Sequence, residues 1–308
     1  MIEKHQPPLI SVIVPCYQQS EELPDCLRAL LAQRFEQSYE IILVDSASDP
    51  HVKRIAGDFP AVRLIRSAER LLCGSAKNLG AQHARAKYLA FTDSDCIPES
   101  DWLQHAHDTL HSGKPAVGGP VLDALPGNPI AVTDNLLQFA EVPPGRPAGR
   151  IAHIPGCNIG ISREAFLKAG RFSEHPFGED VSLTGSINRV YPEGIHFNPG
   201  MRVAHSGRST FISMWNHQKL FGYWRGKLGL FLTDSQQRLG QNIIALPFVV
   251  VKRLVFIFNC IVRWNNASLV RNILLIPLIL AGLISWSLGF RQGCIHSVSN
   301  PVEISYGE

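Results

Sequence analysis

The first ninety residues alternate between short, apolar, β-prone runs and segments with helical periodicity, and this alternation restricts the fold most. The predicted strands are residues 9–14, 40–44, 62–65 and 88–92, and the predicted helices are residues 21–33, 51–59 and 75–86. Strands that alternate with helices form parallel sheets through right-handed crossovers. We therefore predict an α/β fold with a mostly parallel sheet.

Candidate ligand-binding side chains follow three of the predicted strands at the point where each strand ends. Pro15 and Tyr17 come after the first strand, Asp45 after the second, and Asp93 and Asp95 after the last. In open α/β sheets, ligands bind at the carboxyl ends of the strands. We therefore expect these side chains to line one edge of the sheet.

Asp93 and Asp95 are separated by a single residue, so their carboxylates repel each other unless a cation or a proton lies between them. Mg²⁺ and Mn²⁺ accept oxygen ligands of this kind and share them with substrate phosphates. The alternative is that the aspartates only cap the next helix, where Asp is favoured. Their position at a predicted strand end favours a metal site.

Several other classes of protein fit the sequence poorly. No glycine-rich dinucleotide motif follows the first strand and no P-loop motif occurs, which disfavours dinucleotide oxidoreductases and P-loop enzymes. A net charge of +3 without a basic run argues against nucleic acid as a partner. The 7 cysteines form no Cys-Xaa-Xaa-Cys pair, and residues 1–8 lack the apolar core of a signal peptide. Both features indicate a cytosolic catalytic domain.

The middle of the chain interrupts the alternation. Residues 114–155 are rich in proline and glycine, and we predict that they form an extended loop or lid over the sheet. A strand is expected to resume at Gly156, and Ser162 to cap a helix over residues 163–169.

Two further places carry candidate functional groups. Glu179 and Asp180 begin a predicted helix that runs to residue 190. The helix dipole favours carboxylates there whatever their function, and it also keeps a carboxylate ionised and able to accept a proton. His205 follows a short predicted strand, where a histidine is either structural or a metal ligand.

Taken together, the motifs of residues 9–206 resemble those of an inverting family 2 glycosyltransferase of the GT-A fold. The matching motifs are residues 11–18, 41–49, 76–81, 88–95, 156–163 and 178–180. Each motif is common by itself, but the set in this order and spacing is specific. The resemblance implies a GT-A fold and transfer of a sugar from a nucleotide-diphosphate donor to an acceptor hydroxyl, with inversion.

The resemblance also implies roles for single residues. The residues expected to bind the nucleotide-sugar donor are Pro15, Tyr17, Asp45, Lys77, Asn78 and Asp93. Asp95 would bind Mn²⁺ or Mg²⁺ on the diphosphate, and His205 stands where some related enzymes have another metal ligand. Asp180 would be the catalytic base, and Glu179 would help to orient the acceptor.

Two departures from the family pattern concern the nucleotide base. Cys16 and Gln18 stand where threonine and asparagine are more usual, and Ser46 replaces a second Asp or Asn. The identity of the base therefore stays open. Two other classes of function also stay open, namely a nucleotidyltransferase and a non-catalytic, membrane-tethered protein that binds a nucleotide or sugar.

The carboxyl-terminal third suggests a membrane. After the catalytic domain (residues 1–206), residues 207–242 mix basic and aromatic side chains, as at membrane interfaces, although a helix packed on the catalytic domain fits equally. Two apolar stretches lie within residues 243–292, before a tail at 293–308. Residues 243–262 contain Pro247, Lys252 and Arg253 and fit an interfacial or re-entrant helix, whereas the uncharged residues 273–290 are just long enough to span. We expect the cytoplasmic face of a membrane (the inner membrane if bacterial) and a glycan or lipid-linked acceptor.

Overall fold

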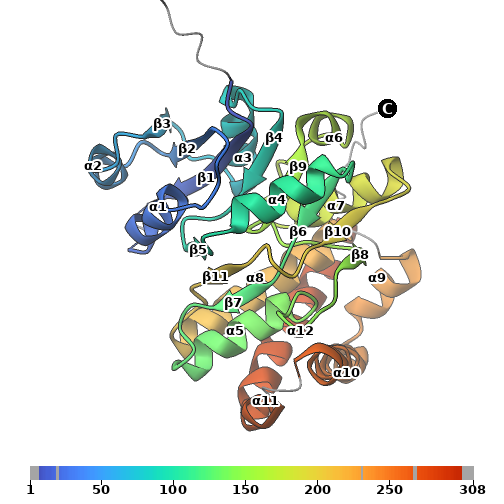
Figure 1. The fold of residues 1–308 in the computed structure, drawn as a ribbon. Helices are drawn as coiled ribbons and strands as arrows, with labels where there is room; N and C mark the ends of the chain where they lie inside the picture. Colours follow the sequence, from blue (N-terminus) through green and yellow to red (C-terminus); the bar gives the residue numbers. More distant parts are fainter. Residues whose placement is uncertain (1–6, 19–20, 230–231, 266–268, 300–308) are drawn as a thin grey trace, which may run out of the picture. The chain divides into compact units, whose positions relative to one another are not determined.

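The computed structural model describes residues 7–18, 21–229, 232–265 and 269–299 (Figure 1). The chain divides into two units, of which the first comprises Met1–Val121 and Pro147–His205 and the second Leu122–Arg146 and Ser206–Glu308. Residues 122–146, which the predicted boundaries place in the catalytic domain, thus group with the carboxyl-terminal residues. Residues 300–308 of the predicted tail lie outside the described part of the chain.

The first unit contains an eight-stranded mixed sheet with the order β3-β2-β1-β4-β9-β6-β10-β8. These strands are β1 (Ile10–Tyr17), β2 (Tyr39–Ser46), β3 (Val62–Ser67), β4 (Tyr88–Phe91), β6 (Ala116–Gly118), β8 (Gly149–Ile151), β9 (Ile159–Ser162) and β10 (Ile195–Phe197). The four strands β3, β2, β1 and β4 are parallel, and β6 pairs with β10 in the same way. Strand β9 is antiparallel to both β4 and β6, and β8 is antiparallel to β10.

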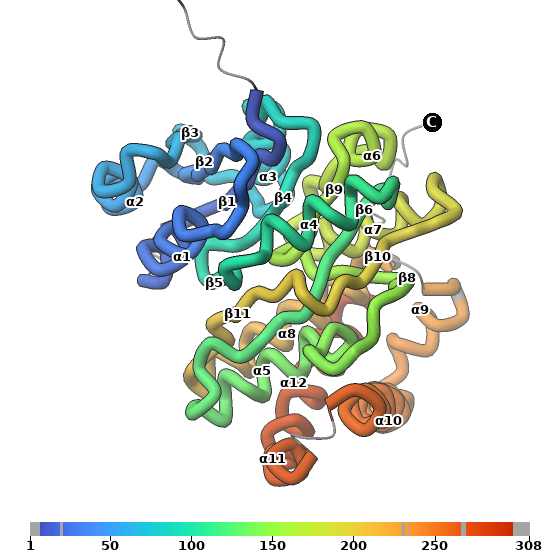
Figure 2. Tube along the Cα trace, viewed as in Figure 1, coloured from blue at the N-terminus to red at the C-terminus, as the bar shows by residue number. Residues whose placement is uncertain are grey.

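The register of the parallel strands aligns their carboxyl ends, as expected from the sequence. Cys16 lies beside Asp45, and Ile13 lies beside Phe91. The parallel strands therefore end at one edge of the sheet, and nearly all residues of β1 and β4 are buried. Figure 2 shows the course of the chain through these strands. Asp93 follows β4 by two residues and reaches this same edge.

Helices flank the sheet of the first unit. They are α1 (Leu23–Leu31), α2 (Pro50–Gly57), α3 (Cys73–His83), α4 (Trp102–His111), α6 (Arg163–Lys168) and α7 (Glu179–Val190). Helix α3 packs on β1 and β2. Its close approach depends on Gly80, where an added Cβ would lie 2.4 Å from the side chain of Ile13. The predicted cap of α6 is confirmed, because the Ser162 hydroxyl accepts a hydrogen bond from the amide of Ala165.

The prediction of an extended loop over residues 114–155 is wrong. This segment contains β6, β7 (Val121–Asp123), α5 (Pro129–Phe139) and β8. The cause is local capping, since Asn128 Oδ1 accepts hydrogen bonds from the amides of Ile130 and Ala131, and Pro129 occupies the first turn. Proline at a helix start is compatible with the helix, so its presence did not indicate a loop.

The second unit is helical. Besides α5 it contains α8 (Phe211–Leu228), α9 (Asp234–Gln241), a 3₁₀ turn (Ile243–Ala245), α10 (Leu246–Trp264), α11 (Leu269–Leu274) and α12 (Ile276–Ser299). Apolar side chains of α5, α8, α10 and α12 form its core, including Leu136, Met214, Ile257 and Leu283. Pro247 lies in the first turn of α10 and does not interrupt it.

Helices α8 and α12 approach each other through glycines. A Cβ at Gly222 of α8 would lie 1.9 Å from the carbonyl oxygen of Trp286, and one at Gly289 of α12 would lie 1.9 Å from that of Lys219. The Ser285 hydroxyl also donates a 2.6 Å hydrogen bond to the carbonyl of Trp215. Close packing of two backbones at small residues is typical of helices in membranes, although it also occurs elsewhere.

Two helices of the described chain, Ile243–Trp264 and Ile276–Ser297, are long and apolar enough to cross a membrane by length and composition. Only 17% of the first is buried inside the protein, against 56% of the second. The exposed large apolar side chains of this region lie mainly on α10 and α11; they include Phe248, Val251, Val255, Val270 and Leu274.

Candidate active site

Asp45 organises the turn after β2. Its side chain is fully buried, and its carboxylate accepts hydrogen bonds from the amide of Asp49 at 3.0 Å and from Arg66 Nε at 3.1 Å. Ala47 and Ser48 have φ angles of 76° and 52°, a left-handed conformation that side-chain-bearing residues rarely adopt. The carboxylate thus holds a tight, strained turn at the edge where a ligand is expected.

Tyr17 and Pro15 occupy the end of β1 with different exposure. Pro15 is buried beside Val44, whereas Tyr17 is 38% exposed. The guanidinium of Arg70 lies 4.3 Å from the centroid of the Tyr17 ring. An exposed aromatic ring next to a cation can stack a base and attract a phosphate.

Lys77 connects the loop after β4 with the start of α7. Its side chain is fully buried, and its ammonium lies 3.0 Å from Asp93 Oδ1, 3.8 Å from Glu179 Oε1 and 3.0 Å from the carbonyl oxygen of Gly156. Burial alone would lower the pKa of Lys77, but its anionic neighbours, Asp93 above all, raise that pKa well above its usual value. The lysine therefore stays charged and draws three separate segments together.

Asn78 is the neighbour of Lys77 on α3, and its amide is used by the backbone. Its Nδ2 donates to the carbonyl of Phe172 at 2.9 Å, and its Oδ1 accepts from the amide of Phe172 at 3.1 Å. These two bonds fasten α3 to the chain after α6. The predicted role of Asn78 in donor binding stays a prediction.

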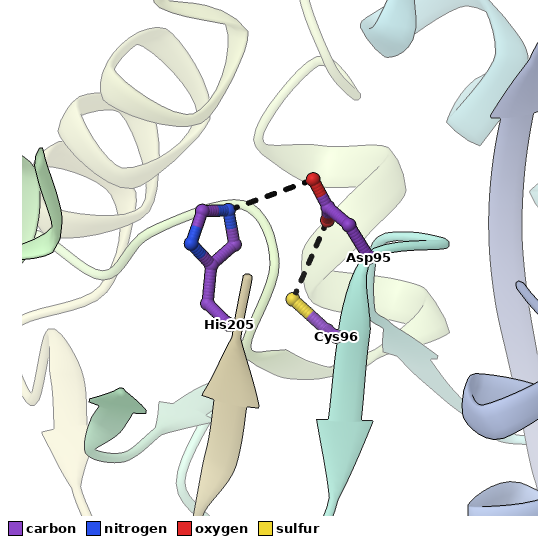
Figure 3. A group of neighbouring side chains, drawn as sticks. All are labelled: Asp95, Cys96 and His205. Carbon is purple, nitrogen blue, oxygen red and sulfur yellow. Dashed lines mark hydrogen bonds and ion pairs between the residues drawn. The ribbon is translucent and has the colours of Figure 1, made fainter. Parts of the chain in front are cut away.

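Asp95 and His205 lie together, as Figure 3 shows. His205 Nε2 is 3.7 Å from Asp95 Oδ2, and the ligand atoms of Asp95, Cys96 and His205 all lie within 4.8 Å of one another. The antiparallel pairing of β5 (Cys96–Pro98) with β11 (Val203–His205) produces this cluster, because Cys96 lies opposite His205. Carboxylate and imidazole ligands suit a divalent ion, so the residues present fit Mn²⁺ or Mg²⁺.

Cys96 is the third group of this cluster, and sequence reasoning missed it. The side chain is fully buried, and burial raises the pKa of its thiol well above the usual value. A protonated thiol is a weaker metal ligand than a thiolate. Asp95 and His205 are therefore the stronger candidates for ligands.

Asp180 is held by backbone amides at the start of α7. Its Oδ2 accepts from the amide of Gly156 at 3.0 Å, and its Oδ1 from the amide of Val181 at 2.7 Å. Nε2 of His153 lies 3.9 Å from Asp180 Oδ2, and the carboxylate is 22% exposed. A fixed, solvent-accessible carboxylate of this kind can accept a proton from a bound hydroxyl.

Comparison with known families settles the class of the chain. The sequence model described as "Glycosyl transferase family 2" matches residues 11–170, more than half of the chain. The chain belongs to glycosyl transferase family 2. The match contains Tyr17, Asp45, Lys77 and Asp95 and ends before Asp180, and it tests the role of none of these residues.

Curated relatives agree with the family. Glycosyltransferase AglE of Haloferax volcanii is 32% identical over 184 residues, which cover 58% of this chain and 60% of AglE. Glycosyltransferase GlyG of Streptococcus pneumoniae is 33% identical over 100 residues, covering 31% of this chain and 33% of GlyG. The matched part of the chain thus spans less than two thirds of each of these relatives.

Solved structures show the GT-A fold. The mannosyltransferase PcManGT from Pyrobaculum calidifontis, solved in complex with GDP-Man and Mn²⁺, superposes with a TM-score of 0.59 at 17% identity and covers 93% of this chain and 88% of that one. GalNAc-T7, solved with UDP, GalNAc and Mn²⁺, gives a TM-score of 0.51 at 16% identity, covering 71% of this chain and 48% of that one. At these identities the likeness is one of fold, and the predicted GT-A fold is confirmed.

Glu179 is a carboxyl group whose pKa is strongly raised by its surroundings. Burial first, and then the charge of Asp180, raise the pKa of Glu179 to about 7, although Lys77 opposes the change. Next to it, a Cβ at Gly156 would lie 2.9 Å from Lys77 Nζ, so any larger residue there would have to displace the ammonium group. Two carboxyl groups with different surroundings therefore stand at the start of α7.

The site also contains residues that sequence reasoning did not single out. Gly156 was part of a matching motif, but its backbone contacts with Lys77 and Asp180 were not foreseen. Arg70 and His153 lie in segments without a recognisable motif, so only the structure shows that they reach the site.

Proposed function

We propose that this family 2 glycosyltransferase transfers a sugar from a nucleotide-diphosphate donor to an acceptor hydroxyl in a single, inverting displacement. The observation that carries the proposal is the network around Lys77. Its ammonium contacts Asp93, two residues before Asp95, and Glu179, next to Asp180. These contacts support the proposal that Asp95, as a metal ligand, and Asp180, as a proton acceptor, act in one site.

Donor binding is assigned to the edge formed by β1, β2 and β4. Tyr17, with Arg70 over its ring, would stack on the base, Asp45 would hydrogen-bond the base or ribose, and Asp93 would reach the ribose. Asp95 and His205 would hold a divalent ion on the diphosphate. Charge that develops on the leaving diphosphate would be neutralised by that ion when it is bound.

The acceptor is assigned to the side of Asp180. An inverting displacement requires a base on the face of the sugar opposite the leaving group, by analogy with inverting glycoside hydrolysis. Asp180 would remove the proton from the acceptor hydroxyl, and Glu179, whose pKa burial raises to about 7, would help to orient the acceptor in its protonated form.

Mn²⁺ is the first ion to test. An imidazole ligand such as His205 is more typical of transition metals than of Mg²⁺. The two solved structures of similar fold also contain Mn²⁺ with a nucleotide or nucleotide sugar.

The test of this function is thermal stabilisation by nucleoside diphosphates. UDP, GDP and TDP are each added with and without Mn²⁺, because a ligand that binds the native state raises Tm. We expect one nucleotide to raise the Tm of the wild type only when Mn²⁺ is present, and Asp95→Ala to abolish that rise while the protein stays folded. Equal stabilisation of the variant would remove Asp95 from the metal site.

A membrane location for the acceptor is supported by the second unit. Residues 206–299 contain ten lysines and arginines but a single acidic residue, Asp234. Helix α10 exposes large apolar side chains, including Phe248 and Val255, with Lys252 exposed between them. Apolar and basic groups on one helix suit the interface of an anionic membrane, where a lysine can extend to the headgroups. We propose the cytoplasmic face and a lipid-linked or other glycan acceptor of cell-envelope synthesis.

Of the two alternative functions, a nucleotidyltransferase is disfavoured by membership of glycosyl transferase family 2. A non-catalytic binding protein would not need an anchored carboxylate at the acceptor side. The contacts of Asp180 with two backbone amides therefore favour an enzyme.

A further inference from the structure

His153 lies behind Asp180 and is fixed in place by α7. The Asn188 side chain donates a 2.7 Å hydrogen bond to the carbonyl of Ala152, and Nδ1 of His153 lies 3.1 Å from the Thr184 hydroxyl. Its other ring nitrogen, Nε2, faces Asp180 Oδ2 at 3.9 Å. Neither the family motifs nor the proposed donor site uses this histidine.

The Thr184 hydroxyl determines which nitrogen of His153 carries the proton. Its oxygen lies 2.7 Å from the carbonyl of Asp180 and 3.2 Å from that of Val181, and its single hydrogen is donated within this helix turn. With its hydrogen donated to these carbonyls, the hydroxyl accepts from His153, and we therefore assign the proton to Nδ1. The neutral ring then presents the unprotonated Nε2 to Asp180.

We infer that His153 acts through Asp180: during transfer it takes over from Asp180 the proton of the acceptor hydroxyl. The inference rests on the proposed function, in which Asp180 is the base. When a carboxylate and an unprotonated ring nitrogen face each other, either of them can bind the same proton. The distance of 3.9 Å between Nε2 and Oδ2 is about 1 Å longer than a hydrogen bond. A small movement on substrate binding would bring the two atoms within hydrogen-bonding distance.

The transfer balances as follows. The acceptor oxygen bonds to the anomeric carbon while the bond from that carbon to the diphosphate oxygen breaks, and its electron pair leaves with the diphosphate. The acceptor's proton passes to Asp180 Oδ2 and then to His153 Nε2, so that Asp180 becomes a carboxylate again and His153 an imidazolium. The His153 side chain is 31% exposed, so the imidazolium can release the proton to water.

Other charged groups near the pair are the same in every variant compared below. Glu179 adjoins Asp180 on α7, and Lys77 of α3 approaches both through Gly156. A pH profile of the wild type will contain the titration of Glu179 as well. Only the difference between wild-type and variant profiles therefore reports on His153.

The experiment measures kcat and KM for transfer against pH in the 308-residue chain. For His153→Gln we expect kcat at neutral pH to fall by about tenfold to hundredfold, with little change in the donor KM. This fall in kcat is smaller than the one expected when the base itself is lost. The pH profile of kcat should differ from that of the wild type, because glutamine cannot take up the proton. His111→Gln, on the exposed end of α4, should match the wild type.

The Thr184 variants separate proton transfer from packing. Thr184→Val keeps the shape but removes the hydroxyl, so Nδ1–H loses its acceptor and the pH profile should shift as in His153→Gln. Thr184→Ser keeps the hydroxyl and should restore the wild-type profile. NMR of wild-type protein labelled with ¹⁵N-histidine gives a readout that needs no variant to fold, and it should show Nδ1–H for His153.

Two results would overturn the inference: a wild-type kcat and pH profile for His153→Gln, or a neutral His153 protonated on Nε2. Asp180→Asn distinguishes this failure from failure of the proposed function. If Asp180→Asn is inactive while His153→Gln behaves as the wild type, only the role of His153 is wrong. If Asp180→Asn keeps full activity, the assignment of the base is wrong, and the role of His153 falls with it.

Discussion

Replacing Glu179 by glutamine tests the electrostatics of the site through stability. The side chain is 13% exposed, and burial followed by the charge of Asp180 raises its pKa from 4.5 to about 7. Between these pH values the folded protein holds a proton on Glu179 that the unfolded chain has released. Because the native state binds more protons, the free energy of unfolding falls as pH rises through this window.

The size of the effect follows from the two pKa values. Their difference of about 2.5 corresponds to about 3 kcal/mol, because one pKa unit is worth about 1.4 kcal/mol. Glutamine resembles the protonated acid but does not titrate. Glu179→Gln should therefore match the wild type near pH 4.5 and be about 3 kcal/mol more stable at pH 8. For a unit of this size that is a Tm difference of about 6–12 °C.

The assay is the Tm of the full chain, followed by tryptophan fluorescence in detergent at several pH values between 4.5 and 8. Glu164→Gln is the matched control, since Glu164 lies in the first turn of α6 but is exposed. We expect the control to differ from the wild type by less than about 0.5 kcal/mol at any pH. A Tm difference for Glu179→Gln that does not grow with pH would refute the reasoning.

Three further predictions concern the base, the buried cation and the membrane. Asp180→Asn should bind donor nearly normally but lose turnover by about a hundredfold or more, and near-normal turnover would make Asp180 a helix-start carboxylate only. Lys77→Met leaves the nearly buried Glu179 and the partly exposed Asp93 without their cation and should cost up to about 3–5 kcal/mol, measured as a lower Tm; an unchanged Tm would contradict this. The full chain should stay with membranes through a high-salt wash, whereas replacing Phe248, Val251 and Val255 by serine should release it; a wild type soluble without detergent would contradict this.

Much of the fold could be predicted because its signals are local. The apolar runs that became β1, β2, β3 and β4 are short and bounded by turn residues, and their alternation with helices implied a parallel arrangement. The antiparallel insertion of β9 between β4 and β6 was beyond this reasoning. It joins segments about seventy residues apart, and no periodicity within either segment specifies such a pairing.

The site likewise has a part that local sequence signals predict and a part that depends on long-range pairing. Asp45, Asp93 and Asp95 could be placed on one edge because strand ends converge there. The proximity of Asp95 and His205 depends on the pairing of β5 with β11, two three-residue strands too short to give a clear pattern. The burial of Lys77 likewise depends on three segments that meet only in the folded chain.

By hydropathy and charge alone, residues 273–290 are the better candidate for a membrane span and residues 243–262 the poorer one. Contacts within the second unit change that order. The uncharged stretch 273–290 lies mostly in α12, whose glycines and Ser285 pack on α8. The stretch 243–262, which contains Lys252, forms the far more exposed α10. A helix whose apolar face is already covered by protein gains less from lipid than one whose apolar face is open. Membrane binding should therefore depend first on α10, although its charged residues made this stretch the weaker of the two predicted spans.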